Sequence, residues 1–444
     1  MTILGIDKAI FYTLITRGWN IFSGLLTIAF ITKYLTPELQ GYYYTFNSLI
    51  ALQIFAELGL SYAIIQIASH EKAKLRWNAD GTLSGDPEIK GRLQSLLKFT
   101  LVWYSLAALI LISFLLPAGI YFFNAELQYK DSNLNFSTSW SWLVVFTSAN
   151  LFISGASAII EGCGKVAQIA KLRLLQSIFA IPAGWLVLSQ GGGLYALTVS
   201  SLMMAIVGLG WLFINYRLFF SDIYTHKTNS PGMSWGKEIW PFQWRIAISW
   251  MSGYLIFQIF SPMLFSAHGP IVAGQMGMSL QIFGALNAAA IAWISTKAPT
   301  FGILIANKEW SELDTLFMRA LKQSLLILIF CVIALIISLY ILNKTHSPYL
   351  SRILPLPLFA SLGIVCVANH IVLAEAAYLR SHKLDPFMPL SVGNGLLTLA
   401  LAILLIKPYG LLGAVGAYAL PNLTIALIGG SFVFMRFRKS YRKL

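Results

Sequence analysis

Long apolar runs alternate with short polar or charged breaks along the whole chain. A bilayer core about 30 Å thick needs roughly 20 helical residues at 1.5 Å per residue, and many of the runs are of about that length. Breaks rich in charge, Gly or Pro set the ends of the predicted helices. Twelve membrane-spanning helices are predicted, at 9–31, 42–67, 99–123, 140–160, 174–190, 194–216, 242–267, 271–296, 321–342, 353–379, 387–406 and 411–435.

Composition agrees with an all-α polytopic membrane protein. Of the 444 residues, 57% are hydrophobic and only 11% are charged, which excludes an ordinary soluble enzyme. The three cysteines, Cys163, Cys331 and Cys366, are far apart and lie in or beside apolar runs, so they are interpreted as small core residues. The first apolar run is expected to remain as a helix, since no signal-peptide cleavage pattern follows it.

The formal net charge of +14 is distributed unevenly among the predicted connections. With a cytoplasmic N-terminus, 24 Lys and Arg residues fall on the cytoplasmic side, 5 on the opposite side and 2 inside helices, which accounts for all 31. The positive-inside rule therefore predicts that both termini are cytoplasmic. The basic charge is explained by this topology, with attraction to anionic membrane lipids as a by-product, so no nucleic-acid partner is expected.

Similar local patterns recur in the two halves of the chain. Arg17 and Arg245 lie early in the first helix of each half, and a Pro-x-x-x-Gly turn follows each of them. The recurrence predicts two parallel six-helix bundles, over 1–220 and 241–444, joined by a cytoplasmic linker at 221–240. Repeats of this kind usually enclose a central cavity.

The chemistry expected of an enzyme is not found in the sequence. No G-x-x-x-x-G-K-[ST] string is present, and the six histidines show no metal-ligand spacing, so neither ATP-driven transport nor a metal site is predicted. His370 lies deep in a predicted helix. It is interpreted either as a hydrogen-bonded interior histidine or as part of a proton relay.

Polar side chains form stripes on four predicted helices, the first two of each half. Charged groups inside a bilayer usually face a bundle interior or water, so the stripes predict a hydrated cavity; the alternative is that they only hold helices together. The candidate substrate-binding residues on or next to these stripes are Arg17, Asn20, Arg245, Ser249, Gln275 and Lys297, and other stripe positions are Thr13, Gly24, Thr27, Gln53, Glu57, Ser61, Ser252, Ser279 and Asn287.

Two charged positions allow more than one interpretation. Arg17 and Glu57 are each 20 residues from Pro37, so an antiparallel hairpin would place them at one depth. Glu57 is then a counter-ion of Arg17, a coupling site for H⁺ or Na⁺, or a group of the cavity wall. Arg245 has no acid at the matching position, which suits a phosphate-bearing ligand, whereas snorkelling to the membrane interface is the alternative.

The chain resembles the polysaccharide (O-antigen type) flippases of the multidrug/oligosaccharidyl-lipid/polysaccharide exporter superfamily. The resemblance rests on Arg17, on the string Phe30-Ile31-Thr32-Lys33-Tyr34-Leu35-Thr36-Pro37-Glu38-Leu39-Gln40-Gly41-Tyr42-Tyr43, on Glu57-Leu58-Gly59-Leu60 and on Glu161-Gly162-x-Gly164-Lys165. It implies two six-helix bundles in the V-shaped, MATE-like transporter fold, and twelve spans fit the polysaccharide branch better than the fourteen of the lipid II branch.

The resemblance also implies a function. It is alternating-access translocation of an undecaprenyl diphosphate-linked oligosaccharide, such as an O-antigen, capsule or exopolysaccharide repeat unit, from the inner to the outer leaflet of a bacterial cytoplasmic (inner) membrane. In related lipid II flippases cavity arginines meet the diphosphate, a role that carries over to Arg17 and Arg245. Polysaccharide polymerase machinery is a candidate partner, and no cofactor is expected apart from H⁺ or Na⁺ if transport is coupled. The alternatives are a drug or cation antiporter of the same superfamily and, less favoured, a membrane-embedded enzyme or assembly protein.

Overall fold

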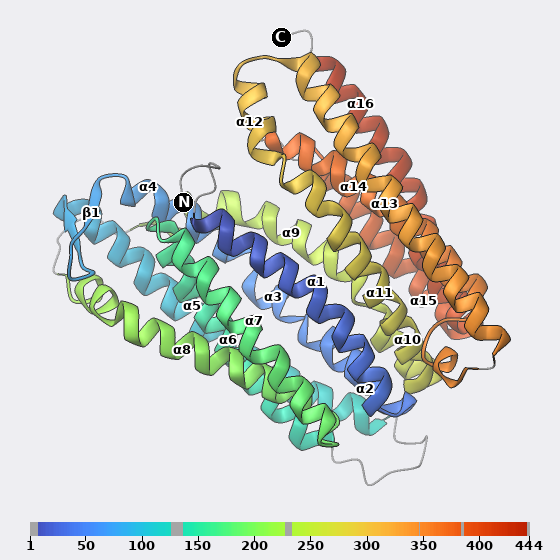
Figure 1. Cartoon of the computed structure of the whole chain (residues 1–444). Coiled ribbons are helices and arrows are strands. Elements are labelled where there is room, and N and C mark those ends of the chain that lie inside the picture. The colour runs from blue at the N-terminus through green and yellow to red at the C-terminus, as the bar shows by residue number, and fades with distance from the viewer. Residues whose placement is uncertain (1–7, 126–135, 227–232, 346, 383–385, 442–444) are drawn as a thin grey trace. The chain divides into compact units, whose positions relative to one another are not determined.

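The computed structural model describes residues 8–125, 136–226, 233–345, 347–382 and 386–441, and nearly all of them are helical (Figure 1). The prediction of an all-α membrane protein is confirmed, because these residues are almost entirely helical and include ten helical segments long and apolar enough to cross a membrane. The α-helices are α1 (Lys8–Tyr34), α2 (Pro37–Ile50), α3 (Gln53–Glu57), α4 (Leu60–Lys72), α5 (Pro87–Ala125), α6 (Phe136–Gly162), α7 (Val166–Ser189), α8 (Tyr195–Tyr224), α9 (Trp240–Phe257), α10 (Phe260–His268), α11 (Pro270–Ser295), α12 (Ala298–Ala306), α13 (Trp310–Lys344), α14 (Leu356–Ser381), α15 (Met388–Pro421) and α16 (Gly430–Tyr441).

Shorter elements complete the fold. Two π-helical segments, Trp235–Ile239 and Asn422–Gly429, lead into α9 and α16, and a 3₁₀ turn lies at Pro348–Arg352. Strands β1 (Leu75–Trp77) and β2 (Leu83–Gly85) form an antiparallel hairpin.

The number of spans depends on how bent helices are counted. Within the described residues, ten helical segments are long and apolar enough to cross a membrane, and the bent pair Pro37–Glu57 and Leu60–Lys72 adds an eleventh. The segment Met388–Ser440 is interrupted at Gly410, whose φ of 54° and ψ of −125° are not helical. Counting its two arms separately gives the predicted twelve. Leu326 and Phe330 on α13 are 70% and 73% exposed, as expected of a helix surface that faces lipid.

Close packing divides the chain into two compact units. The first unit comprises Met1–Tyr34 and Leu49–Met251, and the second comprises Leu35–Ser48 and Ser252–Leu444. Most of α2 therefore belongs to the second unit, and most of α9 belongs to the first. The division predicted from sequence, with a linker at 221–240, concerns the membrane bundles and stays a prediction.

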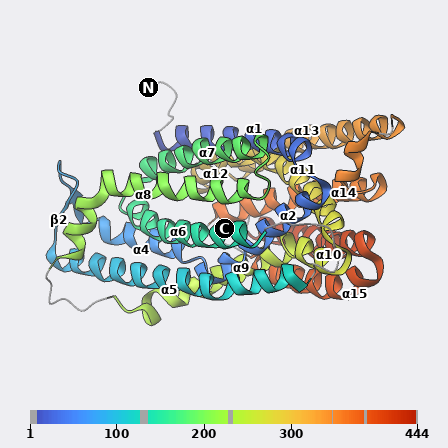
Figure 2. The same cartoon turned by 90° about the horizontal axis from the view of Figure 1, so that it is seen from below.

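In the first unit, α1 packs on α7, α7 on α8, α5 on α6, and α6 also on α4 and α8. Figure 2 shows α1, α7 and α8 as neighbouring helices. The helix α5 begins at Pro87, well before the predicted start at 99, because its first turns carry charge on one side and bury Leu93 and Leu97 on the other. Lys90 in these turns forms an ion pair with Asp222 at 2.7 Å.

The hairpin of β1 and β2 was not predicted, and Trp77 fixes it to the connection between α6 and α7 within the first unit. The indole N–H of Trp77 donates to the carbonyl of Cys163 at 2.8 Å, and the Lys165 ammonium lies 4.4 Å from the indole ring centroid. Burial raises the pKa of the Cys163 thiol to about 12, which keeps this cysteine protonated and unreactive.

The second unit is built around α11 and α14. These two helices pack on each other, α11 also packs on α10 and α13, and α10 packs on α15. At one end, Phe301, Phe317, Tyr378 and Phe434 form an aromatic cluster that joins α12, α13, α14 and α16.

Candidate functional site

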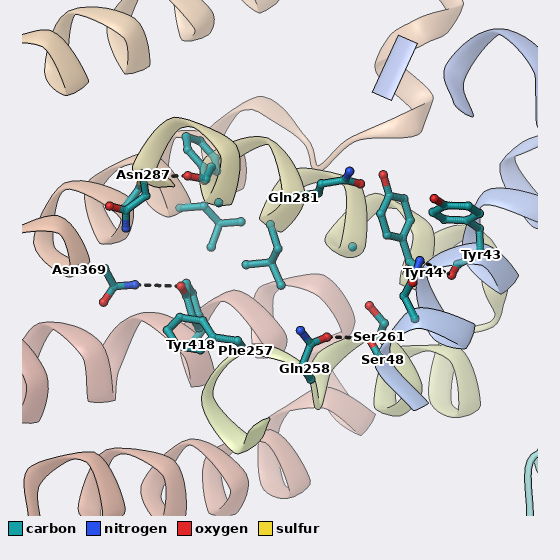
Figure 3. Close-up of a pocket in the computed structure, with 17 residues that line it drawn as sticks. Tyr43, Tyr44, Ser48, Phe257, Gln258, Ser261, Gln281, Asn287, Asn369 and Tyr418 are labelled. Atoms are coloured by element: carbon teal, nitrogen blue, oxygen red, sulfur yellow. Dashed lines mark hydrogen bonds between the residues drawn. The ribbon is translucent and has the colours of Figure 1, made fainter. Parts of the chain in front are cut away.

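A cavity of about 530 Å³ lies within the second unit (Figure 3). Helices α2, α9, α10, α11, α14 and α15 contribute to its wall, with Gln258 in the break between α9 and α10. A volume of this size is within the range of small-molecule sites, about 300–1,000 Å³. The lining residues are Tyr43, Tyr44, Asn47, Ser48, Phe257, Gln258, Ser261, Gly277, Leu280, Gln281, Phe283, Gly284, Asn287, Leu362, Cys366, Asn369 and Tyr418.

The contribution of α2 depends on contacts that fix this helix to the second unit. The Gln40 side-chain amide donates to the carbonyls of Gly274 at 3.0 Å and of Arg352 at 2.8 Å. Tyr44 also packs against Gly277 so closely that a Cβ added at Gly277 would be 2.5 Å from the Tyr44 Cβ. Glycine is therefore required at 277 for α2 to bring Tyr44 into the wall.

The break after α9 places a polar side chain in the cavity. The residues Gln258 and Ile259 interrupt the helical span between α9 and α10. Ser48 on α2 donates its hydroxyl hydrogen to the Gln258 side-chain oxygen at 3.3 Å. Interrupted helices within a membrane are tolerated where they line a polar cavity, and this break is such a case.

The opposite end of the cavity is formed by Asn287 and Asn369, as Figure 3 shows. The amide nitrogen of Asn369 donates to the Tyr418 hydroxyl at 2.9 Å. Asn287, Asn369 and Phe257 also line an adjoining cavity of about 140 Å³. The polar end wall thus borders both cavities.

The cavity is polar but uncharged. None of the lining residues that the structure describes has a charged side chain. The Tyr44 hydroxyl and the Gln281 side-chain oxygen are buried, and neither has a hydrogen-bond partner in the described part of the chain. Unsatisfied buried polar groups are costly, so a ligand that supplies both an acceptor and a donor would be stabilised here. Rings such as Phe257 and Tyr43 add apolar surface for the faces of a ligand.

The predicted site residue Glu57 lies in the first unit, just before a break in the helical span. Its carboxylate accepts hydrogen bonds from the Ser61 hydroxyl at 2.5 Å and the Tyr104 hydroxyl at 3.4 Å. The predicted stripe of Glu57 and Ser61 thus brings two side chains together. Pairing of Glu57 with Arg17 is not the arrangement seen among the described residues, because the carboxylate points to Ser61 and Tyr104.

The two residues after Glu57 have left-handed backbone conformations. Leu58 has φ 51° and Gly59 has φ 64°. A bulky residue such as leucine rarely adopts positive φ, and such outliers concentrate at functional sites. The bend of 42° between Pro37–Glu57 and Leu60–Lys72 follows from these two residues, and it places the carboxylate at the end of a helix.

The other predicted residues of the first unit are on helix surfaces. Arg17 and Asn20 are exposed on α1, Arg245 is exposed on α9, and Ser249 is half-buried one turn further along α9. The Arg245 guanidinium lies 5.5 Å from the centroid of the Trp244 ring. The role of these residues in substrate binding stays a prediction.

Gln275 and Lys297 belong to the second unit, and neither lines the cavity described above. The Gln275 side-chain amide donates to the Ser351 carbonyl at 3.0 Å, so it fastens the 3₁₀ turn to α11. Lys297 is exposed where α11 gives way to α12. Asn287, from the same predicted stripe as Gln275, does line the cavity.

Sequence reasoning missed most of the cavity wall. Tyr43 and Asn47 are four residues apart on α2 and so share a face, but neither was among the predicted site residues. Gln281 and Asn369 are isolated amides in apolar helices. Attention to uncharged amides and tyrosines inside apolar runs, in addition to charges, is the signal that would have found them.

Comparison with solved structures assigns the fold. A multidrug resistance MATE family transporter of the MOP superfamily in an inward-facing conformation is similar with a TM-score of 0.67 and 15% identity, over 96% of each chain. The outward-facing conformation of such a transporter is similar with a TM-score of 0.59 and 14% identity, covering 98% of this chain and 96% of the other. The MATE multidrug transporter DinF-BH gives a TM-score of 0.64 and 16% identity, covering 98% of this chain and 95% of the other.

The fold is thus that of MATE transporters of the MOP superfamily, solved in both inward-facing and outward-facing states. No protein-family model matches the sequence, and no curated protein matches it. At sequence identities near 15% these structural similarities define the fold only. The substrate must be inferred from the residues of the site.

Proposed function

We propose that the protein is an alternating-access transporter of a lipid-linked oligosaccharide in the bacterial cytoplasmic membrane. The observation that carries this proposal is the uncharged, hydrogen-bonding lining of the cavity in the second unit. Sugars present many hydroxyl donors and acceptors and no charge, so amides, hydroxyls and aromatic rings suit them. A cationic drug held in the same cavity would lack a carboxylate partner there.

The fold and the sequence support the same proposal. Structures of this fold exist in two states that open to opposite sides, as alternating access requires. The sequence resembles polysaccharide flippases over nearly its whole length, and exposed Arg17 and Arg245 are candidates to meet the diphosphate of the carrier. A polysaccharide polymerase would then consume the translocated unit.

Deletion and complementation test the cargo. In cells that lack the chromosomal gene, the wild-type chain should restore surface glycan and remove the lipid-linked precursor that accumulates. Gln281→Leu and Gln258→Leu should restore much less glycan at equal membrane abundance, because each removes a hydrogen-bonding side chain from the cavity. Ser338→Ala, on the exposed face of α13, is the matched control. Normal surface glycan in the deleted cells would refute the proposal.

A drug or cation antiporter is the second candidate, and Glu57 is the observation that favours it. An exchanger coupled to H⁺ or Na⁺ needs an acidic group that changes its occupancy, and Glu57 lies in a membrane span with neutral partners. Efflux of a cationic dye from proteoliposomes, driven by a proton or sodium gradient and lost in Glu57→Gln, would support this candidate. Glycan export without dye efflux would exclude it.

A further inference from the structure

A buried histidine lies directly behind the polar end wall of the cavity. His370 on α14 is 0% exposed and sits between α11 and α13 in the second unit. Its Nδ1 is 3.2 Å from the side-chain oxygen of Asn287, and its Nε2 is 2.8 Å from the Ser324 hydroxyl. Asn287 in turn lines both cavities.

The partners of the imidazole define where its proton is. An amide oxygen only accepts hydrogen bonds, so Nδ1 must carry the hydrogen that joins His370 to Asn287. The Ser324 hydroxyl then has two acceptors within reach, Nε2 at 2.8 Å and the Leu321 carbonyl at 3.0 Å. If the proton moved to Nε2, the same hydroxyl would accept it and donate to the Leu321 carbonyl. Both of these side-chain partners are uncharged, and a buried ring without an acid partner is neutral.

This hydrogen bond fixes the orientation of the Asn287 amide. With its oxygen held by His370, the amide nitrogen is turned away from the ring. This nitrogen has no hydrogen-bond partner among the residues that the structure describes, and the half-buried side chain borders open space on the cavity side. Beside it, the Asn369 nitrogen is engaged by Tyr418, which leaves the Asn369 oxygen as an acceptor. The end wall therefore offers a donor from Asn287 and an acceptor from Asn369.

We propose that His370 is a positioning residue for cargo recognition. Its Nδ1–H hydrogen bond holds the Asn287 side chain so that the N–H donors of the amide face the cavity. The end wall then favours a cargo group that accepts a hydrogen bond from Asn287 and donates one to Asn369. A sugar hydroxyl and a sugar acetamido group both have this chemistry. The inference rests on the proposed function for the identity of the cargo, whereas the orientation of the amide is a property of the protein alone.

Conservative variants separate the two ring nitrogens. An asparagine at 370 places a donor near the position of Nδ1, and a glutamine places one near the position of Nε2. His370→Asn should therefore still hold Asn287, whereas His370→Gln should reach Ser324 and release Asn287. Ser324→Ala is the matched control, since it removes the other partner and leaves the Nδ1 hydrogen bond in place.

Nitrogen-15 NMR of the full-length protein in lipid vesicles, labelled at histidine, tests the positioning without any cargo. The signal of His370 is the one lost in His370→Asn. We expect a protonated Nδ1 in the wild type and in Ser324→Ala, and a shift of the proton to Nε2 in Asn287→Ala. A wild-type ring protonated at Nε2, or a tautomer that Asn287→Ala leaves unchanged, would overturn the proposal.

Export in complemented cells tests the recognition. At equal membrane abundance, His370→Asn should retain most surface glycan, and His370→Gln and Asn287→Ala should lose about tenfold, which is the loss of one hydrogen bond of about 1.4 kcal/mol. Equal export by His370→Asn and His370→Gln would refute the role in recognition. If the wild type exports no glycan, the proposed function fails, and the NMR result still decides whether His370 positions Asn287.

Discussion

At the scale of single residues, Glu57 combines a charged group with neutral partners. Glu57→Gln keeps a side-chain oxygen for Ser61 and Tyr104, so its thermal unfolding midpoint in detergent should be close to that of the wild type. Glu57→Leu leaves both hydroxyls without this acceptor, which costs about 1–3 kcal/mol for each hydroxyl that stays buried and unsatisfied. The midpoint of Glu57→Leu should therefore be clearly lower.

The same variants also examine the predicted pairing with Arg17. If an ion pair with Arg17 stabilised the protein, Glu57→Gln would be as unstable as Glu57→Leu, and adding Arg17→Gln would restore stability. Equal midpoints for Glu57→Gln and the wild type would leave the hydrogen bonds to Ser61 and Tyr104 as the structural role of the carboxylate.

Arg245 is the residue we expect to meet the diphosphate of the cargo. A guanidinium forms two parallel hydrogen bonds with phosphate oxygens. Lysine keeps the positive charge but cannot form this bidentate pair. Arg245→Ala should stop glycan export at normal protein level, Arg245→Lys should retain part of it, and Arg245→Glu should be the most defective. Immunoblots of membranes measure the level of each variant protein, and surface glycan is measured in the same cells, so that export can be compared at equal protein level.

A matched control is available in the same unit. Arg217 on α8 is also exposed and also lies near an aromatic ring, with its guanidinium 6.0 Å from the Phe213 centroid. Arg217→Ala should leave export unchanged. Full export by Arg245→Ala, or a loss of abundance that matches the loss of export, would show that Arg245 only anchors its helix at the interface.

At the scale of elements, the bend after Glu57 depends on Gly59. A Cβ added there would lie 2.4 Å from Cγ2 of Ile246, and φ of 64° adds about 1–2 kcal/mol of strain for any other L-residue. Gly59→Ala should therefore lower the unfolding midpoint, whereas Leu58→Gly, which removes strain at φ 51°, should not. Gly24→Ala on α1, where nothing lies within 4 Å of the added Cβ, is the control, and an equal effect at both glycines would contradict this account.

The elements themselves were largely predictable, and their grouping was not. An apolar run of bilayer length forms a helix whatever its neighbours, so the helical spans follow from hydropathy. Which helices pack together depends on side-chain shape and on distant hydrogen bonds. The hydrogen bonds from the Gln40 side chain to the carbonyls of Gly274 and Arg352 join residues more than 200 positions apart. No local sequence pattern indicates these contacts.

The candidate site was predictable only in part, for a related reason. Charge stands out in an apolar sequence, so Glu57 could be singled out as a candidate, and its contact with Ser61 follows from helical spacing. Its role stays a prediction, whereas Asn287, from a predicted polar stripe, does line the cavity. The lining of the cavity is uncharged, and Tyr43 or Asn369 differ little from ordinary packing residues until the fold brings them together. The break at Gln258 does have a local mark, because Pro262 four residues later cannot donate a helical hydrogen bond to the Gln258 carbonyl, but nothing in the sequence shows that this break faces the cavity.

At the scale of the whole molecule, the asymmetry of basic residues predicts how the chain is inserted. Alkaline phosphatase, which is active only outside the cytoplasm, should be inactive when fused at Leu444 and active when fused at Gln128 or Thr345. The tail contains five Lys and Arg residues after an even number of predicted spans. Gln128 and Leu444 lie outside the described residues, so this prediction rests on the sequence. An active fusion at Leu444 would reverse the proposed orientation.

The membership of residues 35–48 in the second unit has a consequence for biosynthesis. The ribosome makes this segment early, but Gly274 and Arg352, which accept hydrogen bonds from Gln40, follow 234 and 312 residues later. At about 5–20 residues per second the delay is on the order of tens of seconds. During that time residues 35–48 have been synthesised but lack the residues they pack against in the second unit. The second unit, in turn, needs this early segment in addition to its own later helices to complete its packing.

A fragment that starts at residue 233 should therefore be degraded when it is made by itself and should persist when residues 1–226 are co-expressed. Stability of the lone fragment would show that the early segment is dispensable for assembly.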